Sequence, residues 1–186
     1  VLGGNSGNLT SAVIQAGGGL GGTLAIENAN GGTLNGLTIT NSAAYGGNAG
    51  TQAFGSVNFG GPAAGGTIRI VGTGTHTISN SSIDGSIIQA GLYPNGTDRS
   101  SSEGNAINVS SAGVTVTLRN VTVKNSLSNQ TSNYSGGALF VSSSASVSVI
   151  GSTFSGNSAN KGGAISTSGT SSLTIANSTI TGNTAI

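Results

Sequence analysis

The feature of this chain that most constrains its fold is a repeat. Five stretches begin with a short glycine-containing motif that ends in Leu or Ile, and they start at Gly21, Gly65, Gly104, Gly136 and Gly162. An apolar residue lies 10 or 11 positions after each motif, and another always lies 5 positions further on. Repetition held in register five times indicates stacked units of structure, not merely a bias in composition.

Short strands, and not helices, are predicted within each repeat. Gly, Ser, Thr and Asn are poor helix formers, and no segment carries apolar residues at the period of a helix. Apolar and polar residues alternate instead, as at Leu24 and Ile26 or at Val147 and Val149. This pattern is typical of strands with one face turned inward. Three short strands joined by turns are what one coil of a parallel β-helix needs.

We therefore predict an all-β fold, a right-handed parallel β-helix (solenoid) of about five coils over residues 21–186, with loops inserted at one corner. Right-handedness is expected because parallel crossovers are nearly always right-handed. Residues 1–20 are expected to form an N-terminal cap or a preceding coil. The inward columns are predicted to be Leu24, Ile68, Ile107, Leu139 and Ile165; Leu34, Ile78, Leu118, Val149 and Ile175; and Ile39, Ile83, Val123, Phe154 and Ile180.

A polar column is predicted at the corner between the last two strands of each coil. Gly and Asn tolerate the left-handed backbone of a tight corner, and stacked Asn side chains can bond from coil to coil. The corner residues are Gly36, Asn80, Asn120, Gly151 and Asn177. Outward hydroxyl ladders are expected on either side of it: Thr33, Thr77, Thr117, Ser148 and Thr174; and Thr38, Ser82, Thr122, Thr153 and Thr179.

The motifs at the C-terminal end carry a family resemblance. Gly-Gly-Ala-Leu at 136–139 and Gly-Gly-Ala-Ile at 162–165, paired with Phe154-x-x-Asn157, resemble the repeat of polymorphic outer-membrane proteins and of β-helical autotransporter passengers and adhesins. The likeness covers 136–186 well and 21–130 in a looser form, and Ile180 replaces the Phe of the second motif. It implies a bacterial cell-surface or extracellular location and an adhesive or structural role.

The charged residues do not predict an active site. β-Helical polysaccharide-cleaving enzymes need clustered carboxylates, but only Asp84 and Lys124 fall at equivalent positions of successive coils. They are expected to form an exposed ion pair. We interpret Asp98, Arg99 and Glu103 as solvated loop charges. No catalytic residue and no cofactor are predicted.

Other partners are also disfavoured. The chain has no Cys and a single His, His76, which is expected to be hydrogen-bonded in the core, so no metal site is predicted. A net charge of +1 gives no basic stripe for nucleic acid. No apolar run is long enough to insert into a membrane.

The segments that lengthen the coils are the candidate binding surface. Extra residues follow the last apolar column at 42–64, 87–103, 126–135 and 157–161, so loops would gather at one edge. Aromatic residues supply rigid contact area for proteins and sugars. The alternative is that they pack as a satellite core beneath the loops. Five of the seven aromatic residues lie in these segments: Tyr45, Phe54, Phe59, Tyr93 and Tyr134.

The function predicted is that of a non-enzymatic extracellular β-solenoid, a surface adhesin or structural element. Partners would be a host or neighbouring-cell surface, glycans, or copies of the chain itself. Residues 1–26 and 162–186 carry no charge to protect an end from edge pairing, so we expect a longer solenoid, end-to-end stacking into a filament, or a cap formed by 1–20. The alternatives are a glycan- or ice-binding module, although Asp84 and Lys124 interrupt the Thr array that begins at Thr38 and Thr40, or a polysaccharide-cleaving enzyme.

Overall fold

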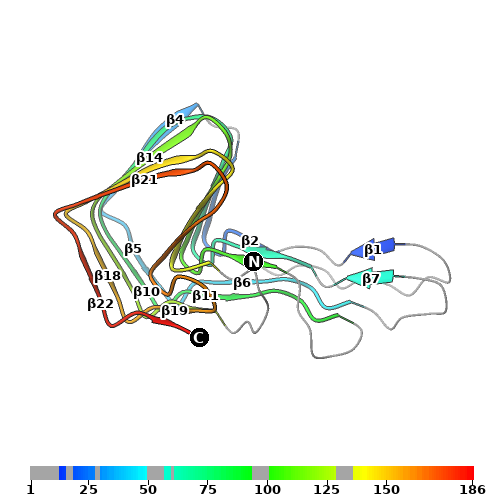
Figure 1. Cartoon of the computed structure of the whole chain (residues 1–186). Helices are drawn as coiled ribbons and strands as arrows, with labels where there is room; N and C mark the ends of the chain where they lie inside the picture. Colours follow the sequence, from blue (N-terminus) through cyan, green and yellow to red (C-terminus); the bar gives the residue numbers. More distant parts are fainter. Residues whose placement is uncertain are drawn as a thin grey trace.

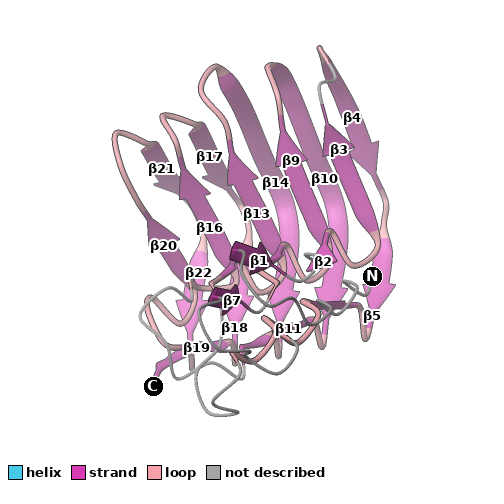
Figure 2. Ribbon diagram, turned by 90° about the vertical axis from the view of Figure 1, so that its right-hand side faces the viewer, coloured by secondary structure: helices cyan, strands magenta, loops and turns pink. Residues whose placement is uncertain are grey.

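The computed structural model describes residues 13–15, 19–27, 30–49, 57–59, 61–93, 101–128 and 136–186. The regular structure in these ranges is all β, without a helix, and the paired strands run parallel. Equivalent strands of successive repeats lie one behind another along the sides of a common outline (Figure 1) and side by side after a turn of 90° (Figure 2). These stacked parallel sheets are consistent with a parallel β-helix or solenoid.

Three sheets run through the repeats. One holds β3 (Leu24–Glu27), β9 (Ile68–Val71), β13 (Ile107–Ser110), β16 (Leu139–Ser142) and β20 (Ile165–Thr167). The largest holds β4 (Gly31–Asn35), β5 (Thr38–Thr40), β10 (Gly74–Asp84), β14 (Val114–Lys124), β17 (Ser146–Ile150), β18 (Thr153–Ser155), β21 (Ser172–Ala176) and β22 (Thr179–Thr181). The third holds β6 (Ala43–Tyr45), β11 (Ile87–Gln89), β15 (Leu127–Ser128), β19 (Ser158–Ala159) and β23 (Thr184–Ala185).

Strand register confirms the three inward columns. Leu118 pairs with Ile78 on one side and Val149 on the other, and Val123 pairs in the same way with Ile83 and Phe154. The column that begins at Leu24 is also in register throughout. Its central members are fully buried, like those of the other two columns. Burial of each such aliphatic side chain contributes about 1.5–3 kcal/mol, so these columns are the core.

The corner column also has the expected conformation. All five of its residues have φ between 48° and 70°, in the left-handed region. The Nδ2 of Asn120 donates to Oδ1 of Asn80 over 3.2 Å, and the Nδ2 of Asn80 donates to Oδ1 of Asn35 over 2.9 Å. Side-chain bonds thus connect three successive repeats along this corner.

The asparagine of the Phe-x-x-Asn motif has a specific structural role. Oδ1 of Asn157 accepts a bond from the backbone N–H of Ser126 at 3.0 Å, and its Nδ2 donates to the carbonyl of Val123 at 3.1 Å. Oδ1 of Asn183 accepts the N–H of Asn157 at 3.0 Å in the same way. Each amide satisfies backbone groups of the preceding repeat at a corner where the ladder is interrupted.

The sheet of β6, β11, β15, β19 and β23 corrects the prediction from the sequence. The sequence predicts insertions at 42–64, 87–103, 126–135 and 157–161, but the beginning of each forms a strand that pairs with its equivalents. The first, fourth and fifth repeats therefore hold four short strands, and in the second and third the two middle segments are joined in the long strands β10 and β14. Beyond these strands the first two loops stay together, because the N–H of Ala49 bonds to the carbonyl of Leu92 at 2.9 Å.

The Gly-Gly motif marks the place where each repeat closes on itself. A Cβ on Gly22 would collide with the carbonyl of Ala43, at the end of the same repeat, and with that of Gly66 in the next one. A Cβ on Gly163 would likewise collide with the carbonyl of Thr184. In the first, second, fourth and fifth repeats the second glycine therefore permits close backbone approach near the start of the repeat, whereas the third repeat carries the buried Asn105 at this position.

Pairs of hydroxyl groups lie beside this close approach, partly buried in the first repeat and fully buried in the second. Thr23 bonds to Ser42 in the first repeat, and Thr67 bonds to Ser86 in the second. In the third repeat Ala106 takes the position of the threonine. The hydroxyl of its Ser126 is buried without a hydrogen-bond partner. A buried unsatisfied polar group costs about 1–3 kcal/mol.

We therefore expect Ala106→Thr to stabilise the protein by about 1 kcal/mol, because the new hydroxyl restores the pair seen in two other repeats. Chemical denaturation followed by circular dichroism measures the change. Ala138→Thr is the matched control: Ala138 is equally buried, but its repeat has Asn157 in place of the serine. The control should lose stability through overpacking. A loss in both variants would contradict the assignment.

Near the N-terminus, further strands lie outside the three sheets. β2 (Gly19–Leu20), β8 (Ala63–Ala64) and β12 (Ser102–Glu103) pair in a small sheet, and β1 (Val13–Gln15) pairs with β7 (Val57–Phe59). Residues 1–12 and 16–18 lie outside the described residues. The division into a cap and a solenoid domain therefore stays a prediction.

Candidate functional site

The loop-edge aromatics are only partly within the described residues. Tyr45 ends β6 and is half-buried, and Tyr93 is half-buried beyond the bonded loop segments. Phe59 lies in β7 opposite Gln15, with no side chain described. Phe54 and Tyr134 lie outside the described residues. In the strand register Tyr45 lies opposite Gln89 of the next repeat. Tyr45 and Tyr93 are therefore not equivalent residues of successive repeats. The aromatic surface stays a prediction.

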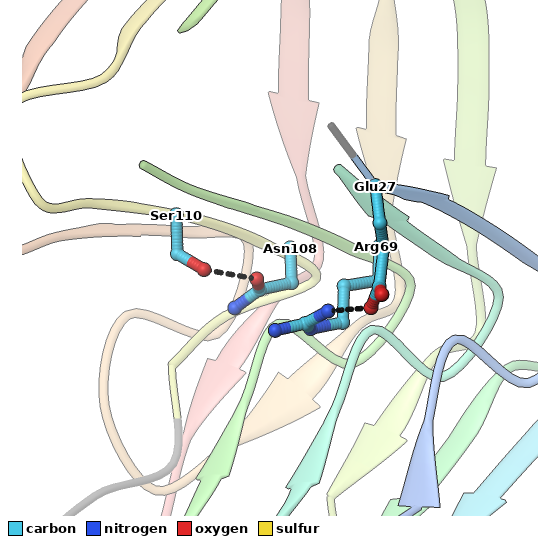
Figure 3. A network of polar contacts seen from close by, with 4 residues as sticks. All are labelled: Glu27, Arg69, Asn108 and Ser110. Atoms are coloured by element: carbon cyan, nitrogen blue, oxygen red, sulfur yellow. Dashed lines mark hydrogen bonds and ion pairs between the residues drawn. The ribbon is translucent and has the colours of Figure 1, made fainter. Parts of the chain in front are cut away.

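A polar cluster on the outer face of β3, β9 and β13 was not found from the sequence (Figure 3). The guanidinium of Arg69 forms an ion pair with Glu27, which lies diagonally across from it on β3. Asn108 lies opposite Arg69 on β13, and its Oδ1 accepts a 2.9 Å bond from the hydroxyl of Ser110. Its Nδ2 lies 3.4 Å from Oε2 of Glu103. The carboxylates of Glu27 and Glu103 thus both lie near Arg69.

The prediction that Glu103 is a solvated loop charge is therefore wrong. It is half-buried in β12, and burial raises its pKa above the ordinary value, against the opposing effects of the Asn108 amide and the Arg69 charge. Burial in a low-dielectric environment disfavours the ionised form of a carboxyl group. The folded protein consequently holds the Glu103 proton to a higher pH than the unfolded chain does.

This shift predicts how stability depends on pH. Because the pKa of Glu103 is raised on folding, its favourable contribution is present below the unfolded value and is lost as pH rises through the folded value. Gln cannot ionise, so Glu103→Gln should increase the free energy of unfolding at pH 7 and flatten its decline between acidic and neutral pH. Urea denaturation at several pH values measures both effects.

Asp84→Asn is the control of opposite sign, because the pKa of Asp84 is lowered and its stabilising contribution is lost as pH falls. A Glu103→Gln variant less stable than the wild type at pH 7 would show that the charge partners outweigh burial.

The ion pair expected between neighbouring repeats is confirmed. Nζ of Lys124 lies 3.2 Å from Oδ2 of Asp84, and Nδ2 of Asn125 donates to Oδ1 of Asp84 over 2.8 Å. The Asn125 bond and then the Lys124 partner lower the pKa of Asp84. Both side chains of the pair are substantially exposed, so solvent screens the attraction and the pair orders the surface more than it stabilises the fold.

His76 is a core residue, as predicted. It lies in register with Val116, is 3% exposed, and its Nε2 is 3.3 Å from the carbonyl of Thr73. Among the described residues no three of His, Asp and Glu gather to form a metal site. Asp98 and Arg99 lie outside that part of the chain. No described helix is long and apolar enough to cross a membrane.

A regular surface of hydroxyl groups covers the outward face of β4, β10, β14, β17 and β21. Two adjacent files run along it, in register from strand to strand. They hold only Thr and Ser except for one Gly, and no charged residue interrupts them. We call the following residues the hydroxyl wall: Gly31, Thr75, Thr115, Ser146 and Ser172; and Thr33, Thr77, Thr117, Ser148 and Thr174.

No family model matches the chain, and no curated protein or solved structure is significantly similar to it. The described surface offers three candidate sites: the loop edge, the Arg69 cluster and the hydroxyl wall. Each of the described carboxylates, at Glu27, Asp84 and Glu103, has a side-chain partner in the repeat that follows it.

Proposed function

We propose that this chain is a right-handed parallel β-helix of five coils that serves as a non-enzymatic extracellular adhesin or structural element on a bacterial surface. The observation that carries the proposal is the register of the core, in which each apolar column continues from repeat to repeat without a shift. Such stacking makes a stiff rod whose interior is filled by side chains. Right-handedness follows from the preference of parallel crossovers.

The surface chemistry supports a binding role more than a catalytic one. The carboxylates of the described residues take part in ion pairs and hydrogen bonds between neighbouring strands, as at Glu27 with Arg69 and Asp84 with Lys124. The resemblance of the Gly-Gly-Ala motifs to surface adhesins points the same way. The proposed ligand is a host or neighbouring-cell surface or its glycans, bound at the loop edge near Tyr45 and Tyr93.

Binding of the purified, fluorescently labelled chain to bacterial and host cells, and to a panel of glycans, tests this proposal. Tyr93→Ala is expected to reduce binding in a variant that circular dichroism shows to be folded, whereas Thr115→Ala on the hydroxyl wall should leave binding unchanged. Detectable turnover of pectins or alginates would contradict the non-enzymatic role, and equal binding by all variants would contradict the loop-edge site.

The hydroxyl wall favours one second candidate, recognition of ice. The Thr array beginning at Thr38 and Thr40 is interrupted by Asp84 and Lys124, but the hydroxyl wall is continuous. Neighbouring strands lie about 4.8 Å apart, so the hydroxyls form a regular two-dimensional array. Thermal hysteresis that disappears in Thr117→Lys would establish this role, and its absence in the wild type would exclude it.

A further inference from the structure

The end of the stack formed by the fifth repeat is open. Ile175 and Ile180, which face inward in their columns, are 43% and 47% exposed, whereas Val149 and Phe154 one repeat earlier are fully buried. A depression of about 520 Å³ opens there, lined by residues that include Ile165, Leu173, Ile175, Ile180 and Ala185. β21 is the last strand of its sheet, so its outer edge lacks a strand partner within the described chain.

The opposite end is built from equivalent residues. Leu24, Ile26, Leu34 and Ile39 of the first repeat pack against the core on one side and are only partly buried. β4 is the terminal strand of the same sheet at this end. β5 and β22 occupy equivalent ladder positions and have the same sequence, Thr-Ile-Thr.

We propose that the fifth repeat of one copy of this chain stacks on the first repeat of a second copy, so that the ladders continue across the joint. This inference rests on the proposed β-helical structural role and names its partner. Extending the observed register places Ile180 against Ile39 of the second copy, Ile175 against its Leu34 and Ile165 against its Leu24. In the same register Leu173 faces Gly32 of the second copy. Gly32 has no side chain and no heavy atom within 4 Å of its Cβ position, so it leaves room for the Leu173 side chain.

Polar groups are compatible with the same joint. At this corner Oδ1 of Asn157 accepts the N–H of Ser126, and Oδ1 of Asn183 accepts the N–H of Asn157, each from the repeat before it. Across the joint the N–H of Asn183 would face Ser42 of the second copy, which occupies the equivalent position. No charged residue lies in 162–186, and the described part of the first repeat carries only Glu27, which is paired with Arg69. The joint therefore places no like charges opposite one another.

The contact is head-to-tail and uses two different surfaces, so stacking without closure makes a filament. Unguarded strand edges pair in this way unless charge or a cover prevents it. The apolar area at both ends provides the driving force, because half-exposed isoleucines become buried on stacking.

Sedimentation velocity and electron microscopy of the purified chain, from about 1 to 200 μM, test the proposal over a range in which a Kd in the micromolar region is visible. Uniform rods that lengthen with concentration are expected. Ile180→Lys places a charge in one face of the joint, and Ile39→Lys does so in the other, so each variant alone should stay monomeric. Thr174→Lys is the matched control, since it adds the same charge to the fifth repeat on the outward face.

The decisive measurement is made on a mixture of Ile180→Lys and Ile39→Lys, each of which has one stacking surface blocked. Ile180→Lys keeps a functional first repeat and Ile39→Lys a functional fifth repeat, so an equimolar mixture should form discrete heterodimers and no longer species. Ile180→Lys added in small amounts should also shorten wild-type rods. Circular dichroism checks that both variants are folded, and if Ile39→Lys is not, the shortening of wild-type rods by Ile180→Lys still decides.

A monomeric wild type at every concentration, or aggregation that Ile180→Lys does not change, would overturn the stacking. Retention of cell or glycan binding by a monomeric chain would leave the proposed function intact, so the two failures can be told apart.

Discussion

Replacement of Phe154 by alanine is expected to lower the free energy of unfolding by about 3–5 kcal/mol. Phe154 is fully buried and is the largest of the fully buried side chains of the described core. It stands in the column between Val123 and Ile180, with a neighbouring repeat on either side. Truncation of the side chain leaves a cavity. Because β18 is hydrogen-bonded to β14 on one side and β22 on the other, the backbone cannot move in to fill it. Urea denaturation monitored by circular dichroism measures the loss.

Ile180→Ala is the matched control for this experiment. Ile180 lies in the same column but is 47% exposed at the end of the stack, so its truncation should cost less than about 1.5 kcal/mol. The comparison is made at low concentration, where the proposed end-to-end contacts are dissociated. Equal losses for the two variants would show that the last repeat is as well covered as the fourth, contrary to its exposed surface.

The core was predictable because one interval never changes. The constant spacing of 5 residues between the second and third columns spans a single corner, and in the second and third repeats the strands β10 and β14 run through that corner without interruption. Gly or Asn at this corner identifies the left-handed residue from the sequence alone. Pairs such as Ile78 with Leu118 and Ile83 with Val123 follow from counting residues.

The fourth strand segment was missed because it carries almost no pattern. Segments such as Ala43–Tyr45 and Leu127–Ser128 are two or three residues long and contain mostly small side chains, so there is no alternation to detect. They are held in place by backbone bonds to their equivalents, for example from the N–H of Leu127 to the carbonyl of Ser86 at 2.8 Å. Strand pairing of this kind is decided by the stack, not by local sequence.

The Arg69 cluster was missed for a different reason. Equivalent positions were compared along columns, but Glu27 and Arg69 lie in neighbouring columns and meet diagonally. Glu103 reaches Asn108 only because the chain turns between β12 and β13, in a segment interpreted as a loop. Diagonal contacts across a sheet depend on register and on side-chain length together. The Asp84–Lys124 pair lies in one column, and counting found it.

The substitution Gly66→Ala is expected to have an effect of similar size to the loss of Phe154, at least about 3 kcal/mol. A Cβ at this position would overlap the carbonyl oxygen of Asn105 and would lie 2.9 Å from that of Ile87. Both atoms belong to backbone, one in the next repeat and one at the end of the same repeat, so neither can move without breaking ladder bonds. The expected result is a large fall in the denaturation midpoint, or no folded protein.

Gly32→Ala separates this steric effect from the general consequence of losing a glycine. No heavy atom lies within 4 Å of the place its Cβ would occupy, and its φ is not in the left-handed region. Alanine there should change stability by no more than about 0.5–1 kcal/mol, with stabilisation expected because the unfolded chain loses freedom. If Gly66→Ala also leaves the midpoint unchanged, the backbone does not cross itself at the Gly-Gly motif. The repeat would then have to close elsewhere, and the Gly-Gly motif would no longer mark where one coil of the proposed β-helix begins.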